Sequence, residues 1–455
     1  MPRKMDLNSK ILMQMKKFIF SATIFLPPVF IFYFVYKFGI TIPYFDQWEL
    51  VPLLEKMHNH TLALADLWTQ HNEHRILFPQ IIMLFLASLS NWNIFLELCT
   101  NIMLATLTIL FLLSILNNTL ETVSPWLKIF TSLMVFSMVQ YENWIWGWQI
   151  QIFLSVLGTV IAIWAVNKWP GKTIGLIIAI SSAVVSSYSF NTGLLSWIAV
   201  LVMMLMQKKW KQKQVIIWIL ACVITILLYY YKYTKCSYHP PLLFFMSHPL
   251  IYIRYILEYL GASLGWNHSV RPLVTIISLF LISLAIFNLW RLDKQKLRDL
   301  APWLSFSLYT CLAACATGVG RAGFGWEQAS SSRYTTISFF LPLSAGVLLW
   351  HSLRFSSKMN QNKLLKILFY VIIIPMFAIS YINGYRDGIQ KMKDLSMSIN
   401  ASVLCLTHLQ ISDDNFSPTG IVDNNSLAML YPDPDIVRSR IKILSELGIK
   451  FKTGE

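Results

Sequence analysis

The chain has 455 residues, of which 56% are hydrophobic and 13% are charged, and its formal net charge is +15. Soluble domains usually carry about 25% charged residues, so this composition excludes an ordinary soluble protein and indicates a chain that lies in a bilayer. The basic residues form short clusters between apolar segments rather than one stripe. This pattern favours a role in membrane topology, and we expect no nucleic-acid partner.

The N-terminal segment is basic and leads into an apolar run from Phe18 to about residue 38, without a small-residue cleavage site. We therefore expect a first span with a cytoplasmic N-terminus rather than a removed signal peptide. The segment 39–93 then lies outside. Its last part, 76–88, has only about 13 apolar residues, which predicts a helix at the membrane interface, since a span needs about 20.

Ten further spans are expected downstream, which makes about eleven in all. Their approximate positions are 94–116, 127–141, 150–166, 172–187, 193–207, 214–231, 272–290, 300–317, 335–352 and 364–382. This arrangement places the basic loops NKWPGK, QKKWKQK, RLDKQKLR and RFSSKMNQNK in the cytoplasm, as the positive-inside rule requires. The outer loops are then 140–149, 187–193, 235–271 and 320–334.

The expected fold class is therefore all-α, a polytopic transmembrane helical bundle with an interfacial helix in its first outer loop. The membrane domain covers 1–383, including the first extracytoplasmic loop at 39–93. Residues 384–455 form a small extracytoplasmic tail, with an Asp/Pro/Asn-rich stretch at 411–435 and a short amphipathic pattern near 436–447.

The first polar cluster is PYFDQWE, directly after the first span, and it contains Asp46 and Glu49. A carboxylate at the membrane surface is partly dehydrated, so we expect the pKa of Asp46 to be raised, which suits a general base acting on a sugar hydroxyl. The alternative is that Asp46 caps a juxtamembrane helix that begins near Trp48.

The second cluster is HNEHR, which contains Glu73, His74 and Arg75 directly before the interfacial helix. Its imidazole and guanidinium groups suit the binding of a phosphate at headgroup depth. A zinc site lacks the H-E-x-x-H spacing and a fourth ligand, so no metal is assigned, although a divalent ion stays open. An ordinary solvated cluster at the interface is the plain alternative.

The third cluster is QYENWIWGWQ, at 140–149. Its alternating tryptophans are most simply an aromatic belt at the membrane surface. Glu142 beside Trp146 also suits a carbohydrate site, because aromatic rings stack on C–H faces while an acid holds hydroxyl groups.

The fourth cluster lies at 318–334 and contains Arg321 and Arg333. Its glycines imitate a dinucleotide-binding loop, but the flanks are membrane helices, so that fold is rejected. The two arginines bracket the loop and suit a phosphate or pyrophosphate leaving group. The alternative is that they reach towards lipid phosphates at the outer surface.

These four clusters share the outer face, and together they resemble motifs of the GT-C superfamily of membrane glycosyltransferases, which use polyprenyl-phosphate sugars as donors. The resemblance rests on PYFDQWE after the first helix, on HNEHRILFPQ before an interfacial helix, and on QYENWIWGWQ and GRAGFGWEQASSSRYTT. It covers most of the chain to about residue 350. The short tail after residue 384 departs from relatives that carry a large carbohydrate-binding domain.

The resemblance implies that Asp46 is the general base, with Glu49 or Glu73 as a second acid. Substrate-binding residues would be His74, Arg75, Glu142, Trp146, Arg321 and Arg333. It also implies a polyprenyl-phosphate-linked donor, a glycan or lipid-linked acceptor such as O-antigen or another cell-envelope polysaccharide, contact with membrane lipid, and no cofactor. The expected location is the bacterial inner membrane, with the active site periplasmic. A lipid-linked sugar transporter or flippase and an O-antigen ligase or polymerase are the alternatives.

Overall fold

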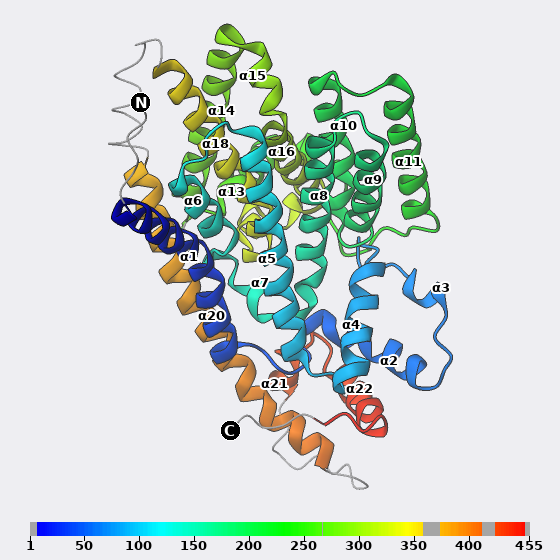
Figure 1. Cartoon of the computed structure of the whole chain (residues 1–455). Coiled ribbons are helices and arrows are strands. Elements are labelled where there is room, and N and C mark those ends of the chain that lie inside the picture. Colours follow the sequence, from blue (N-terminus) through cyan, green and yellow to red (C-terminus); the bar gives the residue numbers. More distant parts are fainter. Residues whose placement is uncertain (1–6, 266, 358–373, 412–423, 451–455) are drawn as a thin grey trace.

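The structure is a computed structural model that describes residues 7–265, 267–357, 374–411 and 424–450. Over these ranges the chain is helical and contains no β-strand, so the all-α prediction is confirmed there. Figure 1 shows a bundle of upright helices with a smaller group of short helices at its lower end, and α1 and α20 cross the bundle obliquely on one side. The helices are α1 (Leu7–Phe38), α2 (Val51–His58), α3 (Leu64–Leu67), α4 (Leu77–Ser90), α5 (Ile94–Thr119), α6 (Pro125–Val135), α7 (Tyr141–Ile145), α8 (Ile150–Lys168), α9 (Thr173–Ser187), α10 (Ser196–Gln207), α11 (Gln212–Tyr230), α12 (Phe244–Ser247), α13 (Pro249–Gly261), α14 (Val270–Leu292), α15 (Lys294–Asp299), α16 (Ala301–Arg321), α17 (Thr335–Ser338), α18 (Phe340–Ser357), α20 (Ile374–Ile411), α21 (Asn424–Ala428) and α22 (Pro434–Glu446).

Within the part of the chain that the structure describes, six helical segments are long and apolar enough to cross a membrane, which makes this chain a helical membrane protein. They are Ile94–Thr119, Gly147–Lys168, Gln212–Tyr230, Val270–Leu292, Ala301–Phe324 and Ser332–Arg354. Each coincides with an expected span. Four shorter apolar helices, Thr23–Phe38, Leu77–Ser90, Thr173–Ser187 and Asn191–Gln207, coincide with the first span, the expected interfacial helix and two further expected spans.

The expected span at 127–141 is shorter than predicted, because α6 ends at Val135. Two polar side chains after Val135 favour the end of the helix there. The Gln140 side-chain amide donates to the Val135 carbonyl at 2.6 Å, and the Ser137 hydroxyl accepts from the Val139 amide at 3.3 Å. Such side-chain bonds offer the backbone an alternative to a continued helix.

The outer loop expected at 235–271 contains a helix that the sequence analysis missed. Helix α13 packs against α14 and α16, and it buries Tyr255, Glu258 and Tyr259. The tail expected from residue 384 also begins differently, since α20 continues through that position to Ile411. Met392, Ile399 and other small or apolar side chains at helical spacing are buried along this extension, which makes it one amphipathic helix.

The loops gather at two opposite ends of the bundle. The basic turn after α8 contacts the turn after α10, where the Gln214 amide donates to the Gly171 carbonyl at 2.9 Å, and Lys296 of α15 pairs with Glu121 after α5. In Figure 1 these turns lie at the upper end, together with α15, whereas α2, α3, α21 and α22 lie at the lower end. Among the residues that the structure describes, the loops NKWPGK, QKKWKQK and RLDKQKLR therefore share one end of the molecule, whereas RFSSKMNQNK and the expected span at 364–382 lie partly outside those residues.

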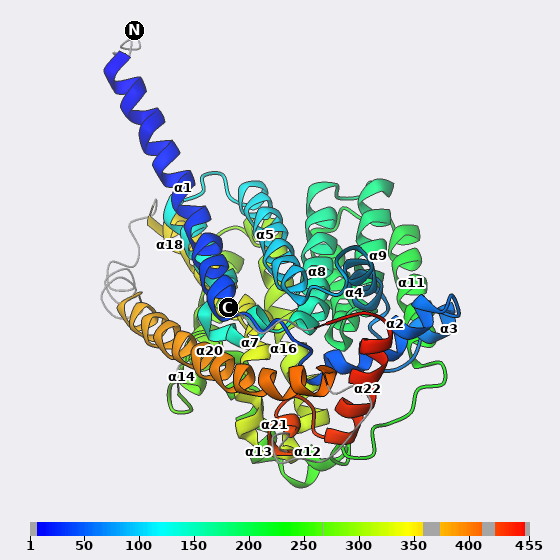
Figure 2. The same cartoon turned by 90° about the horizontal axis from the view of Figure 1, so that it is seen from below.

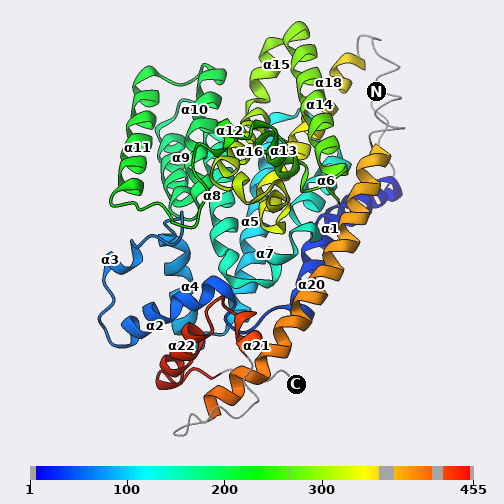
Figure 3. The same ribbon diagram turned by 180° about the vertical axis from the view of Figure 1, so that it is seen from behind.

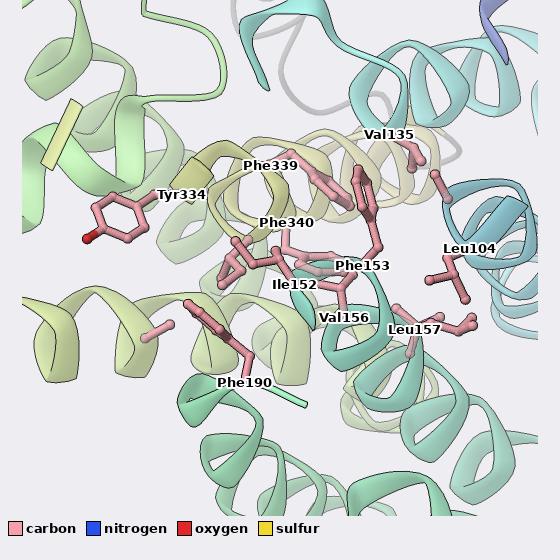
Figure 4. Packing of buried hydrophobic residues seen from close by; sticks show 14 of the residues in the cluster. Leu104, Val135, Ile152, Phe153, Val156, Leu157, Phe190, Tyr334, Phe339 and Phe340 are labelled. Atoms are coloured by element: carbon pink, nitrogen blue, oxygen red, sulfur yellow. The ribbon is translucent and has the colours of Figure 1, made fainter. Parts of the chain in front are cut away.

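The interior is filled by apolar side chains on both sides of α8, as Figure 4 shows. Ile152, Phe153 and Val156 of α8 lie between Leu104 of α5 and the Phe339–Phe340 pair at the start of α18. The same cluster reaches Phe190 and Tyr334, which also line the cavity described below. One wall of that cavity is therefore continuous with the packed core.

The separation of the loops into two opposite ends can be tested by cysteine labelling. Single cysteines are introduced at either end of a variant from which the six native cysteines have been removed. We expect Lys56→Cys, in the last turn of α2, to react with a membrane-impermeant maleimide in intact cells. Lys209→Cys, in the turn after α10, should react only after the membrane is opened. Labelling of both cysteines from the same side would contradict the arrangement.

Candidate active site

A cavity of about 770 Å³ opens between the first loop, at Phe45–Asp46 and Asn72–His74, and the lower ends of α10, α11 and α16. Its wall contains polar and apolar side chains, here called its polar part and its apolar part. The polar part contains Asp46, Asn72, Glu73, His74, Lys235, His239, Arg321, Gln328 and Arg333. The apolar part contains Leu194, Leu195, Ile198, Ile226, Leu242 and Val319. The cavity can therefore hold a ligand with one charged or polar end and one apolar end.

Asp46 lies in a 3-10 turn, Phe45–Leu50, between α1 and α2. Its carboxylate is 3.5 Å from Nε2 of His71. Burial raises the pKa of Asp46, but the hydrogen bond to His71 and the charges of His71 and Arg333 outweigh it, so that the pKa is lowered. The expectation of a raised pKa is wrong, because the sequence did not reveal the cationic neighbours. Asp46 is a carboxylate at neutral pH.

Glu97, near the start of α5, holds the turn that carries Asp46 through its contact with Gln47. The Gln47 side-chain amide donates to Glu97 at 2.7 Å, and the Trp92 indole donates to the other carboxylate oxygen at 3.0 Å. Gly147 allows this approach, since a Cβ at that position would lie 2.1 Å from the Glu97 carboxylate. Glu97 thus has a positioning role that its sequence context did not reveal.

The second cluster forms a tight backbone hairpin in which His71 and His74 exchange two hydrogen bonds of 2.8 Å. Asn72, in its turn, has a φ of 51°, which asparagine tolerates better than most residues. Arg75 ties the hairpin to the end of α11, because its guanidinium donates to the backbone carbonyls of Trp68, Tyr229 and Tyr231. Arg75 is buried, and its guanidinium hydrogen-bonds to backbone carbonyls instead of lining the cavity.

The hairpin turns Glu73 towards the end of α16. Arg321 donates from both Nε, at 3.0 Å, and Nη2 to one Glu73 oxygen, while His74 lies 3.5 Å and His239 lies 3.6 Å from the carboxylate. Burial raises the pKa of Glu73, but the charges of His74 and Arg321 overcome it and hold the pKa at about 2. Burial lowers the pKa of His74 to about 4, and it also lowers the pKa of His239. The cluster is thus a carboxylate–guanidinium pair flanked by neutral imidazoles at pH 7.

The third and fourth clusters meet at Arg333. Its Nε donates to the Ser331 hydroxyl at 3.1 Å and lies 3.8 Å from the Glu142 carboxylate, and its guanidinium lies 5.8 Å from the centre of the Trp146 ring. Glu142 accepts from the Ser332 hydroxyl at 2.8 Å. The Trp146 indole donates to the Tyr44 carbonyl at 2.9 Å, which fixes the ring against the Asp46 turn.

The structure thus brings together most of the side chains that the sequence analysis selected. Six of them line one cavity: Asp46, Glu73, His74, Trp146, Arg321 and Arg333. Three have other surroundings: Glu49 pairs with Arg440, Arg75 binds backbone carbonyls, and Glu142 lines a smaller polar cavity of about 240 Å³.

Several residues of the cavity wall were not predicted from the sequence. Lys235 and His239 belong to the expected outer loop at 235–271, but nothing in the spacing of that loop connects it to Glu73. Gln328 and Tyr334 flank the selected arginines and hydrogen-bond to each other at 2.9 Å. Only the three-dimensional arrangement selects these four residues.

No group of three or more His, Cys, Asp or Glu side chains is placed to hold a metal ion among the residues that the structure describes. Comparisons with protein-family models, curated proteins and solved structures find no match for this chain. The interpretation of the site therefore depends on its own geometry and chemistry.

The pKa of His74 predicts that acid destabilises the protein. Because this pKa is about 4 in the folded state and about 6.5 in an unfolded chain, the unfolded state binds the proton more readily. The free energy of unfolding should therefore decrease by about 3 kcal/mol as the pH falls from 6.5 to 4. Thermal unfolding of the detergent-purified protein measures this loss, and His74→Gln should show a shallower pH dependence. An equal slope in both proteins would contradict the prediction.

Gly147→Ala tests the packing under the Asp46 turn. The new Cβ would lie 2.1 Å from the Glu97 carboxylate and 2.8 Å from the Gln47 amide, so these groups must move apart. We expect a loss of about 1–3 kcal/mol in the free energy of unfolding. Gly320→Ala is the matched control, because a Cβ there meets no atom within 4 Å. Equal melting temperatures of the two variants would count against the close approach.

Proposed function

We propose that the protein is a GT-C-type membrane glycosyltransferase with about eleven spans, which transfers a sugar from a polyprenyl-phosphate carrier to a lipid-linked or surface glycan on the extracytoplasmic face. The observation that carries this proposal is the two-part cavity. Its polar part holds the Asp46 carboxylate together with Arg321 and Arg333, and its apolar part continues along α10 and α11. A lipid-linked anionic donor has the same division between a charged head and an apolar chain.

The apolar part supports a lipid-linked donor over a soluble nucleotide sugar. Ile198 of α10 and Ile226 of α11 both line the cavity and are 45% and 36% exposed. Helix α11 presents most of its surface outward, since its buried residues are Trp218, Thr225 and Tyr229 alone. A chain of isoprene units that lies against these side chains would stay in contact with the bilayer while its phosphate reaches the arginines.

The proposed chemistry uses Asp46 as the base. As the acceptor oxygen forms its bond to the anomeric carbon of the donor, the Asp46 carboxylate takes the hydroxyl proton. The bond between the anomeric carbon and the phosphate oxygen breaks, and its electron pair leaves with the phosphate. A carboxylate of lowered pKa is a weak base, so it takes the proton only as that oxygen becomes acidic during bond formation. Arg321 and Arg333 stabilise the growing phosphate charge.

The other cavity residues have binding roles in this proposal. Trp146 lines the cavity beside Arg333 and is assigned to the sugar, and Glu73 holds the Arg321 guanidinium in place. His74 stacks on Phe190 with ring centres 4.2 Å apart and keeps Glu73 at the wall of the cavity. Glu49, Arg75 and Glu142 have structural partners instead, and we assign them no contact with substrate.

A transporter or flippase would place charged residues near the bilayer midplane. In the six candidate spans, all of which the structure describes, every Asp, Glu, Lys and Arg lies in the first or last turn. Glu97 is the clearest of them, and it binds Gln47 and Trp92. This distribution favours an enzyme over a carrier. An O-antigen ligase or polymerase would share the donor class and differ in the acceptor.

Asp46→Asn tests the base. The amide cannot take the proton, and general-base catalysis typically contributes about 10²–10⁴-fold, so we expect the transfer rate to fall by that factor. Transfer from radiolabelled polyprenyl-phosphate sugars measures it in purified protein. Glu55→Gln is the matched control, since this carboxylate lies on α2 outside the cavity wall. Full activity of Asp46→Asn would remove Asp46 from the mechanism, and consumption of nucleotide sugars alone would overturn the donor.

A further inference from the structure

The C-terminal segment 424–450, with α21 and α22, packs on the part of the first loop that carries Asp46. Figures 2 and 3 show α22 beside α2, and α21 between α22 and α20. Helix α22 buries Val437, Ile441 and Leu444 on its inner face. The contact is therefore a packed interface between residues that are almost 400 positions apart in the chain.

A charged contact joins this segment to Glu49. The Arg440 guanidinium donates to both oxygens of the Glu49 carboxylate, at 3.1 and 2.9 Å, and the Tyr431 hydroxyl donates to the same carboxylate at 2.6 Å. Arg440 also lies over the Tyr431 ring, 5.6 Å from its centre. Burial raises the pKa of Glu49, but the hydrogen bonds from Arg440 and Tyr431 and the charge of Arg440 outweigh it, so that the pKa is lowered. All three side chains have partners in this contact, so Glu49 is an anchor for the C-terminal segment.

A backbone contact holds the other side of the same turn. Phe45, directly before Asp46, has a φ of 47°, which is uncommon for a bulky residue. Its amide donates to the Leu430 carbonyl at 2.6 Å. A residue in this conformation persists only where its surroundings hold it there. Here the C-terminal segment supplies one of the bonds that does so.

We infer that Glu49, Tyr431 and Arg440 are positioning residues for Asp46. The C-terminal segment holds the Phe45–Leu50 turn at Phe45 and Glu49, on both sides of Asp46, while Gln47 is held from below by Glu97. This inference rests on the proposed function, because it assigns the segment a role in presenting the base. Loss of the Arg440–Glu49 pair would let the turn move relative to His71 and Arg333.

The test compares Arg440→Gln with Arg438→Gln. Arg438 lies on the same helix and pairs with Asp435 and Asn424, both inside the C-terminal segment, so its loss leaves the Asp46 turn untouched. A displacement of about 1 Å at a reacting group can cost about 10²-fold in rate. We expect Arg440→Gln to lower kcat about 10- to 100-fold with little change in the KM of the donor, and Arg438→Gln to keep both values.

Two further measurements separate positioning from a general loss of fold. Hydrogen–deuterium exchange of the peptide that contains residues 44–50 should become faster in Arg440→Gln and stay unchanged in Arg438→Gln. The exchanged pair Glu49→Arg with Arg440→Glu should recover part of kcat, since it restores the attraction with reversed signs.

The outcomes that overturn the inference differ from those that overturn the function. An unchanged kcat and unchanged exchange in Arg440→Gln, in an active preparation, would overturn the positioning role alone. If the wild-type protein uses no polyprenyl-phosphate sugar, while hydrogen–deuterium exchange of its Asp46 turn still changes in Arg440→Gln, the proposed function is overturned. The contact would then hold the turn without a role in catalysis.

Discussion

The contact between Glu73 and Arg321 is the interaction on which the candidate site depends. Two charges that leave water carry a large desolvation cost, which good geometry and further hydrogen bonds must offset. Here the pair joins residues 248 positions apart, and His74 and His239 flank the carboxylate. If either partner were absent, the other charge would stay partly buried without its main partner. The pair therefore stabilises the arrangement in which the first loop packs against the end of α16.

This pairing gives the two arginines of the cavity different electrostatic surroundings. Arg321 is largely neutralised by Glu73, and its side chain is 22% exposed. Arg333 is 36% exposed and its nearest carboxylate, Glu142, is 3.8 Å away and already accepts a hydrogen bond from Ser332. A ligand phosphate would therefore gain more from Arg333 than from Arg321. Arg321 would contribute less to the phosphate, and its pairing with Glu73 also fixes the shape of the cavity.

The sequence predicts the helices better than the site, and the reason is physical. Hydropathy reports how well a segment fits the apolar interior of a bilayer, so it located α5, α8 and α14 to within a few positions. It missed the early end of α6 and the whole of α13. The first depends on side-chain bonds from Ser137 and Gln140, and the second depends on packing against α14 and α16. Neither is visible as a run of apolar residues.

The sequence singles out residues whose chemistry is rare in this chain, but it does not show partners that lie far along the chain. Asp46 and Arg333 are polar groups in an apolar chain, so their selection needed no structure. Arg75 had the same appearance, but it binds carbonyls at the end of α11, and Glu49 binds Arg440. Partners separated by 154 and 391 positions cannot be inferred from local spacing.

A short turn cannot hold a functional carboxylate by itself. The 3-10 turn at Phe45–Leu50 has poorer hydrogen-bond geometry than an α-helix, and Phe45 adds a strained backbone angle. Three separate parts of the chain compensate: Glu97 holds Gln47, His71 lies beside Asp46, and Leu430 accepts from Phe45. Because each anchor comes from a different element, the position of Asp46 depends on the correct assembly of the whole lower end of the bundle. In the proposed mechanism, a carboxylate fixed in this way would need little reorganisation to take a proton from the acceptor hydroxyl.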